Sequence, residues 1–289
     1  MKRLICSFSG GRTSGYMTYR VLEEWKDQYD EITVLFANTG LEHEKTLEFV
    51  HNCDKHFGFN TVWLEAITHM ERGKGQTHRV VTFETASRNG EPYYDFVRKN
   101  GIPNVGAPKC TNALKENPLR SYIRTELGHT KKDYDQCIGI RVDEIDRMTF
   151  SSSVTGKVLY PLVSWEIDKP FVLAWWAQQG FDLELSEHLG NCVTCFKKSD
   201  RKLMTIAKNN PEFFEPMQNM ERDLGTCGPY YARTGEFPKF FRKNRTTADI
   251  IAVSKEPFEE FSEKPKQFSI LDDLDISNGC VESCEVGVL

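Results

Sequence analysis

The sequence SFSGGRTSGYM, residues 7–17, decides how the first half of this chain is interpreted. It places two glycines and several hydroxyl side chains between a short apolar run, residues 4–7, and a helical pattern that starts near Thr13. Glycines let the backbone approach an anion closely, and a helix start presents unpaired N–H groups and the positive end of its dipole. We therefore predict a phosphate-binding turn made of Ser9, Gly10, Gly11, Arg12, Thr13 and Ser14.

The spacing of this turn separates it from two common phosphate-binding motifs. It has neither the GxxxxGKS/T spacing of a Walker loop nor the GxGxxG spacing of a dinucleotide-binding turn. The residues alone leave one alternative open, which is an ordinary glycine-rich turn closed by a serine cap.

Strand and helix patterns alternate along the first half of the chain. We predict strands over residues 4–7, 32–37, 61–64 and 136–140, and helices over residues 13–27 and 42–57. This alternation implies βαβ units with right-handed crossovers, and ligands of such folds bind where the carboxyl ends of the strands meet. The predicted fold class is α/β, with a mostly parallel, Rossmann-like sheet flanked by helices.

Two regions depart from that alternation. Residues 67–109 are rich in turn-forming residues, which indicates a substrate-covering excursion with some short structure of its own. After Trp165 the pattern becomes helical, and it includes a pair of cysteines and a polar tail. We predict a nucleotide-binding domain over residues 1–165 and a smaller, mainly helical, cysteine-containing region over residues 166–289.

Composition excludes several protein classes. The chain has 289 residues and a formal net charge of −5, so nothing attracts it to nucleic acid in general. It has no apolar run long enough for a membrane span, and its first residues reach serine and glycine too early for a secretion signal. We expect a cytoplasmic protein with no membrane association.

Five further segments follow the glycine-rich turn in an order that resembles a known family. They are FANTGLEHEKTLEFV (36–50), KCTNALKENPL (109–119), GIRVDEIDR (139–147), YPLVSWEIDKPFVLAWW (160–176) and NCVTCFKK (191–198). With SGGRTS, they are similar to motifs of the phosphoadenosine phosphosulfate (PAPS) reductase family and its PP-loop ATP pyrophosphatase relatives. Ile145 stands where that family usually has serine. The resemblance implies the PP-loop, adenine nucleotide alpha-hydrolase-like fold.

The resemblance also implies roles for individual residues. The phosphates of ATP, or of PAPS or adenylyl sulfate (APS), would lie on the glycine-rich turn with Mg²⁺. The further nucleotide-binding residues it implies are Asn38, Thr39, Gly40, Lys115, Gly139 and Arg141. Arg141 and Glu144 would be catalytic, the arginine by pairing with a phosphate or sulfate and the glutamate by holding Mg²⁺ or orienting Arg141. The alternative for this charged run is a solvated strand end with ion pairs.

The chain contains nine cysteines, and two of them form the CxxC pair Cys192 and Cys195. That spacing suits one metal centre, and the resemblance adds Cys110, although Thr111 replaces the second cysteine of the family's tandem pair. We expect a [4Fe–4S] cluster or zinc on Cys110, Cys192, Cys195 and Cys284, with Cys227 and Cys280 as other candidates for the fourth ligand. The alternatives are a reducible dithiol and a lone active-site thiol.

The expected reaction is adenylation of an acceptor by ATP, followed by sulfur or amine transfer with release of AMP. One alternative is thiol-dependent reduction of PAPS or APS to sulfite with Cys284 as the nucleophile, and another is a non-catalytic binding protein. The partners considered are a small-molecule nucleotide, a sulfur donor or redox protein, a nucleic-acid substrate and a second copy of the chain. Basic and aromatic residues alternate over residues 237–245, a pattern that suits binding of nucleic acid. The alternative is a solvated basic surface whose aromatic residues contribute a little to the core.

Overall fold

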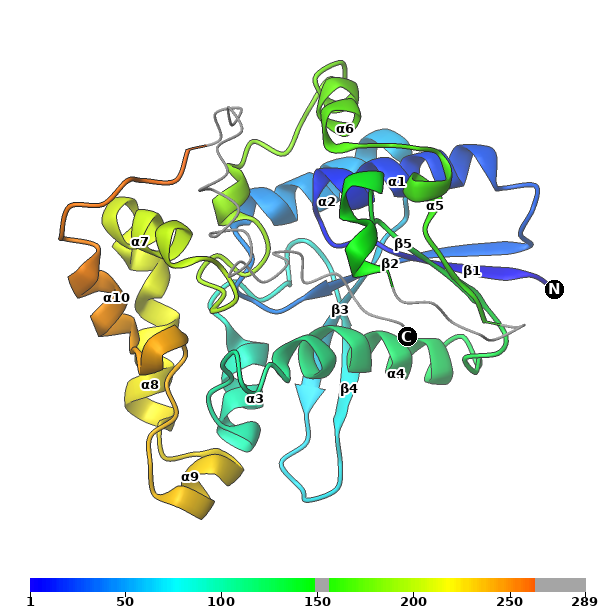
Figure 1. Cartoon of the computed structure of the whole chain (residues 1–289). Coiled ribbons are helices and arrows are strands. Elements are labelled where there is room, and N and C mark those ends of the chain that lie inside the picture. Colours follow the sequence, from blue (N-terminus) through cyan, green and yellow to red (C-terminus); the bar gives the residue numbers. More distant parts are fainter. Residues whose placement is uncertain (149–155, 263–289) are drawn as a thin grey trace.

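A six-stranded sheet forms the centre of the computed structural model, which describes residues 1–148 and 156–262 (Figure 1). The strand order is β4-β3-β2-β1-β5-β6. The strands are β1 (Arg3–Ser7), β2 (Glu31–Asn38), β3 (Val62–Thr68), β4 (Gln76–Val81), β5 (Asp135–Ile138) and β6 (Val158–Leu159). All neighbouring strands pair in parallel except β4, which is antiparallel to β3. The predicted α/β class with a mostly parallel sheet is confirmed.

Helices cover both faces of this sheet. Those in the first part of the chain are α1 (Arg12–Glu24), α2 (Glu44–Phe57), α3 (Glu91–Asn100) and α4 (Asn117–Thr125). Those in the later part are α5 (Pro161–Ser164), α6 (Lys169–Trp176), α7 (Asp200–Asn209), α8 (Glu215–Leu224), α9 (Gly228–Thr234) and α10 (Thr247–Val253). In Figure 1, α1 and α2 lie above the sheet, α4 lies below it, and α7, α8 and α10 gather at one side.

The excursion over residues 67–109 contains β4 and α3. The sequence did not predict β4, because its residues QTHRVV are mainly polar and at most half-buried, as befits the edge of a sheet. Glu65 on β3 lies opposite Arg79 on β4, so the hairpin places a charged pair at the end of the sheet. The two long helices α1 and α2 and strands β1, β2, β3 and β5 lie where the sequence predicts them, within a few residues.

The region after residue 165 shares its hydrophobic cores with the first part of the chain. Trp176 at the end of α6 is fully buried and packs on Phe49 of α2, with ring centroids 4.7 Å apart. Its indole N–H donates a 2.8 Å hydrogen bond to the carbonyl oxygen of Arg12. A second cluster joins Phe96 of α3 to Met217 and Met220 of α8. The helical region therefore packs on the helices that flank the sheet.

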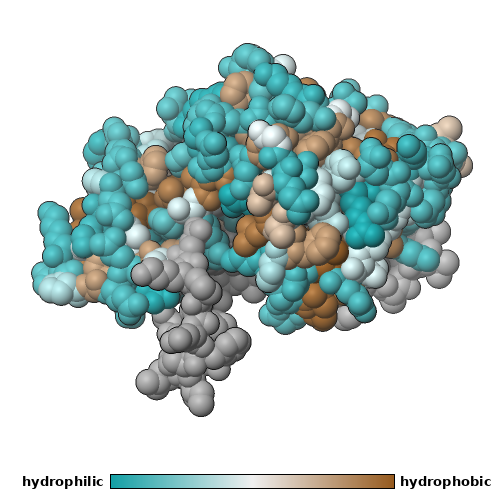
Figure 2. Space-filling view, turned by 90° about the horizontal axis from the view of Figure 1, so that it is seen from above, coloured by the Kyte–Doolittle hydropathy of each residue, from teal (hydrophilic) through white to brown (hydrophobic). Residues whose placement is uncertain are grey.

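The face seen from above is mainly hydrophilic, with apolar side chains scattered over it (Figure 2). Across residues 1–148 and 156–262, no helix combines the length and the apolar character that crossing a bilayer requires.

Candidate functional site

The turn between β1 and α1 is shaped by Gly10. Its φ is +81°, and a Cβ there would lie 2.7 Å from Cγ2 of Thr46, so both the backbone conformation and the packing require glycine. Beyond it, Ser9 and Ser14 close the turn: the Ser9 N–H donates to Ser14 Oγ at 3.1 Å, and the two hydroxyl oxygens are 2.8 Å apart. These hydrogen bonds hold the turn in one conformation, with the hydroxyl groups of Ser9 and Ser14 in contact.

Gly11 differs from Gly10 in having free space around it. Its φ is −106°, which any residue can adopt, and the nearest atom to a Cβ built there is Ser9 Oγ at 3.9 Å. Gly11 is also the N-cap of α1, and no side chain caps that helix start. The first N–H groups of a helix lack intrahelical partners, so an uncapped start beside open space suits an anion.

Arg141 joins the end of β5 to this turn. Its Nη1 donates a 2.8 Å hydrogen bond to Thr13 Oγ1, and the side chain is mostly buried. Gly139 makes this approach feasible, because a Cβ there would lie 3.0 Å from the Cα of Ser14. The missing side chain of Gly139 thus admits the backbone of α1, and its predicted contact with a nucleotide stays a prediction.

Two acids hold Arg141 in place. Asp143 accepts two hydrogen bonds from its guanidinium, at 3.0 and 2.9 Å, and Glu144 lies 3.2 Å from Nη1 while also pairing with Arg147. Burial opposes ionisation of Asp143, but the bonds from Arg141 outweigh it and lower the pKa of this carboxyl. Both acids belong to the short helical segment Val142–Arg147. The sequence predicts that these acids either hold Mg²⁺ or orient the arginines, and in the structure both contact Arg141.

Arg12, also predicted to bind phosphate, directs its guanidinium elsewhere. It forms two hydrogen bonds with Asp182, at 2.7 and 2.9 Å, and a third with the carbonyl oxygen of Leu183. This ion pair ties the start of α1 to the loop after α6. The side chain of Arg12 thus has a structural role. Only the backbone N–H of Arg12 remains at the helix start to face a phosphate.

Asn38, Thr39 and Gly40 follow β2, the strand next to β1. The side chain of Asn38 is fully buried: its amide donates to Glu65 at 2.6 Å and to the carbonyl oxygen of Ser87 at 2.8 Å, and its Oδ1 accepts from the N–H of Gly40 at 3.1 Å. Asn38 therefore shapes the turn and does not present its amide to a ligand. Sequence analysis missed Glu65. The feature that could have revealed it is a single acidic residue within the otherwise apolar strand VWLEAIT.

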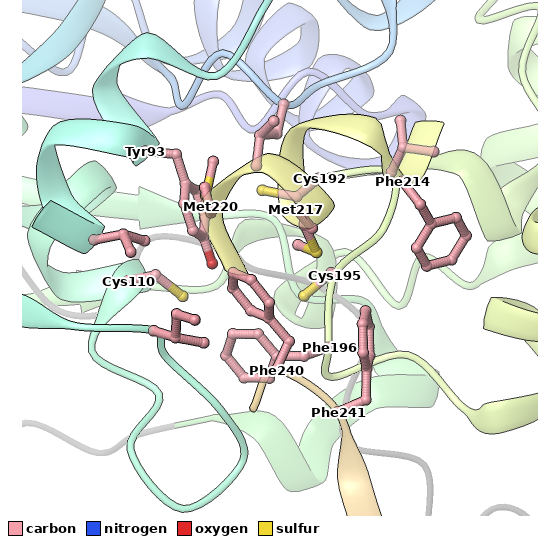
Figure 3. Close-up of a cluster of buried hydrophobic side chains, with 14 of the residues drawn as sticks. Tyr93, Cys110, Cys192, Cys195, Phe196, Phe214, Met217, Met220, Phe240 and Phe241 are labelled. Atoms are coloured by element: carbon pink, nitrogen blue, oxygen red, sulfur yellow. The ribbon is translucent and has the colours of Figure 1, made fainter. Parts of the chain in front are cut away.

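Three of the predicted cysteines line one small cavity. Cys110, Cys192 and Cys195 share it with Tyr93, Thr39 and Lys115. Figure 3 shows the three sulfur atoms and the Tyr93 hydroxyl within the same buried cluster. Tyr93 is buried and hydrogen-bonds Cys110, and burial together with the nearby thiols raises its pKa well above the usual value. Cys110 is more than 80 positions from the CxxC pair in the sequence, so only the fold brings it to Cys192 and Cys195.

Glu42 connects this cavity to the strand edge. Its carboxylate accepts from the Thr39 N–H at 2.8 Å, and Cys192 Sγ lies 3.9 Å from it. Thr39 Oγ1 lies 3.3 Å from the same sulfur. Lys115, predicted to bind phosphate, is buried here and pairs with Glu42 at 3.7 Å. Sequence analysis did not single out Glu42 or Tyr93.

The described residues do not by themselves form a metal site. Within residues 1–148 and 156–262, no three His, Cys, Asp or Glu side chains are arranged to hold a metal ion. The cavity between the cysteines has a volume of about 10 Å³. Cys284 and Cys280 lie outside the described residues. We therefore derive no reaction step through a cluster or zinc ion.

The basic and aromatic run near residue 240 contributes mainly to the core. Phe240 and Phe241 are buried, so they are not available to stack on bases. Arg242 donates to the carbonyl oxygens of Lys197 and Lys198, and Arg245 pairs with Asp200 at 2.6 Å. The structure favours the alternative of a basic surface that helps to build the fold.

Comparison with known proteins finds relatives but no matching family model. The chain is 31% identical over 288 residues to the nin region protein ORF290 of Escherichia phage lambda, covering 98% of this chain and 94% of that protein. It is 26% identical over 118 residues to the protein MJ0973 of Methanocaldococcus jannaschii and 26% identical over 140 residues to MJ0066 of the same organism. These alignments cover 41% and 48% of this chain, and 22% and 23% of the two archaeal proteins.

Proposed function

The chain belongs to the same family as the nin region protein ORF290 of Escherichia phage lambda, and we propose that it is a nucleotide-binding enzyme of the PP-loop class, similar to PAPS reductases. In this proposal, ATP or a related adenylyl nucleotide binds at the carboxyl end of β1, with its phosphates on the turn from Ser9 to Ser14. The neighbouring turn after β2 would face the adenosine.

One observation carries this proposal. The guanidinium of Arg141 contacts the first turn of α1 through Thr13, beside an uncapped helix start and the open space at Gly11. A fixed guanidinium and a row of unpaired N–H groups together suit a tetrahedral oxyanion. The site also lies at β1, where the strand order reverses, which is where open α/β sheets bind ligands.

The proposed reaction has two steps. An acceptor oxygen attacks the α-phosphorus of ATP, the bond to the β-phosphate oxygen breaks, and pyrophosphate leaves. A sulfur or nitrogen nucleophile then attacks the activated atom of the acceptor, and AMP leaves with the acceptor oxygen. Arg141 stabilises negative charge on the phosphates, and Glu144 holds Arg141 and Arg147 in position. Mg²⁺, when bound, would neutralise charge on the leaving pyrophosphate.

The sharpest test of the phosphate turn is the pair of variants Gly11→Ala and Gly180→Ala. Both glycines have room for a Cβ and an ordinary φ, so both proteins should fold. We expect Gly11→Ala to weaken ATP binding in calorimetry by at least about tenfold, because the methyl group occupies the space for a phosphate. Gly180→Ala should bind as wild type does. Equal affinity in all three proteins would contradict the proposal.

The same titration compares nucleotides. Tight binding of PAPS or APS, with sulfite released in the presence of a thiol, would favour the reductase reaction, in which Cys284 is the proposed nucleophile. Formation of AMP and pyrophosphate from ATP with an acceptor would favour adenylation. Binding without turnover of either nucleotide would favour a non-catalytic role.

A cysteine-bound metal is a separate proposal. Its support is that Cys110, Cys192 and Cys195 line one cavity, and it requires a further ligand such as Cys284. Anaerobic purification followed by iron, sulfide and zinc analysis tests it. A metal that is present in wild type, lost in Cys192→Ser and retained in Cys53→Ser would support it, since Cys53 is a core residue of α2. Wild-type protein without metal would contradict it.

A further inference from the structure

A groove separate from the phosphate turn lies between the loop at residues 100–109 and α9. Its volume is about 530 Å³, which falls within the range of roughly 300–1,000 Å³ typical of small-molecule sites. The loop contributes Ile102, Asn104 and Lys109, and α9 contributes Tyr230 and Arg233. None of its lining residues belongs to the phosphate turn or to the cavity between the cysteines.

Gly101 lines this groove and packs against Gly228, which begins α9. Gly101 and Gly228 both have positive φ values, +81° and +88°. A Cβ on Gly228 would lie 2.3 Å from the backbone nitrogen of Gly101, and a Cβ on Gly101 would lie 2.9 Å from the carbonyl oxygen of Cys227. The two backbones therefore touch, and neither position admits a side chain.

The loop wall is braced by Asn104. Its Oδ1 accepts hydrogen bonds from the N–H groups of Gly106, at 3.0 Å, and Ala107, at 3.1 Å, and its Nδ2 donates to the carbonyl oxygen of Lys239 at 3.3 Å. A prolyl ring next to Asn104, at Pro103, further limits the backbone. A groove that is already formed loses little conformational entropy when a ligand binds.

The two charged side chains that line the groove, Lys109 and Arg233, are both cationic. Both side chains are exposed to solvent. No described residue lining the groove is acidic. Arg233 lies 6.0 Å from the ring centroid of Tyr230, whose hydroxyl is held at 2.9 Å by Glu236. The groove thus offers two cations and an exposed aromatic ring.

We propose that this groove binds a nucleotide, with Lys109 and Arg233 on its phosphate and the ring of Tyr230 against its base. Cations with an aromatic platform are the combination that binds a phosphate and an unpaired base together. Lys109 directly precedes Cys110, so the groove and the cysteine cavity flank the same segment. In the proposed reaction, this nucleotide would be the acceptor that ATP adenylates, and that role rests on the proposed function. Binding of a nucleotide in the groove does not depend on it.

Fluorescence anisotropy of a short labelled oligothymidylate, with AMP as competitor, tests the groove. Each of Lys109→Ala, Arg233→Ala and Tyr230→Ala should weaken binding by about tenfold. Each lysine or arginine change should also lower the slope of log affinity against log salt by about 0.7, the value for one phosphate contact on a single strand. The control is Lys26→Ala, which removes an exposed charge at the end of α1, outside the groove.

The titrations are run in wild type and in Gly11→Ala, so that AMP bound at the phosphate turn is recognised. In one outcome, AMP displaces the oligothymidylate from wild type and from Gly11→Ala but not from the groove variants. That result indicates that the groove binds a free nucleotide. Oligothymidylate binding that AMP does not displace indicates that the groove binds a nucleic-acid strand, and either result supports nucleotide binding in the groove. Groove variants that match wild type, an equal loss in Lys26→Ala, or no binding of either probe would overturn the proposal. ATP binding at the phosphate turn could still hold in that case.

Discussion

Arg141 Nη1 donates a 2.8 Å hydrogen bond to Thr13 Oγ1 and thereby joins the end of β5 to the first turn of α1. The two residues are 128 positions apart in the sequence. The contact aligns an arginine with the helix start, and the missing side chain of Gly139 lets the two elements approach each other. The functional proposal depends on this relationship more than on any single residue of the glycine-rich turn.

Replacing Arg141 should affect ligand binding, whereas replacing Arg12 should affect stability. We expect Arg141→Ala to weaken ATP binding by about 10- to 100-fold, the effect of losing a charge-assisted hydrogen bond to phosphate. Arg12→Ala removes the ion pair with Asp182, so it should lower the free energy of unfolding by about 1 kcal/mol. Calorimetric titration and urea unfolding of both variants measure the two effects. An Arg12→Ala protein with the larger loss of ATP affinity would contradict this assignment.

The two adjacent glycines of the turn should respond differently to alanine. Gly10→Ala forces a positive φ on an L-residue and a clash with Thr46, so we expect a loss of at least about 2 kcal/mol in the free energy of unfolding. Gly11→Ala should cost less than about 1 kcal/mol, because its main effect on stability is the poorer N-cap that alanine gives α1. Urea unfolding at constant protein concentration compares the two. Similar losses in both variants would show that the space at Gly11 is filled by the protein itself.

Glu65 should be important for stability although it lies away from the proposed phosphate site. Its buried carboxylate accepts from Asn38, from both the N–H and the hydroxyl of Ser87, and from Arg79. We expect Glu65→Gln to cost about 2–4 kcal/mol, because an amide cannot accept all these bonds and its N–H₂ group faces donors.

Arg79→Ala is the matched comparison for Glu65→Gln. The side chain of Arg79 is half exposed, and Asn38 and Ser87 would still hold the carboxylate. We therefore expect a smaller loss than in Glu65→Gln, measured by chemical denaturation of both proteins. A greater loss in Arg79→Ala would mean that the ion pair, and not the set of neutral donors, stabilises Glu65.

Glu187 should make part of the stability dependent on pH. Burial alone would raise its pKa, but the ion pairs with Lys169 and Lys202 lower it to about 2. The pKa in the unfolded chain is about 4.3, so this contribution is present above that pH and is lost as pH falls towards the folded value. Because the carboxylate is partly exposed, solvent screening limits the contribution to about 1 kcal/mol.

The measurement for Glu187 is the urea unfolding midpoint of wild type and Glu187→Gln between pH 7 and about pH 1.5, a range that spans both pKa values. The difference between the two proteins should be constant above about pH 5 and should shrink below it. A difference that stays unchanged to the lowest pH would show that the side-chain packing of Glu187, and not its charge, stabilises the loop.

The sequence by itself determined the strand and helix alternation and the glycine-rich turn, because both depend on local periodicity and on the backbone freedom of glycine. Only the tertiary structure decided the partners of individual side chains. Arg12 meets Asp182 across 170 positions, Asn38 turns inward to Glu65, and the cysteines gather around Tyr93. Such contacts are set by how helices pack on the sheet, and no short stretch of sequence records which distant group will satisfy a buried charge or amide.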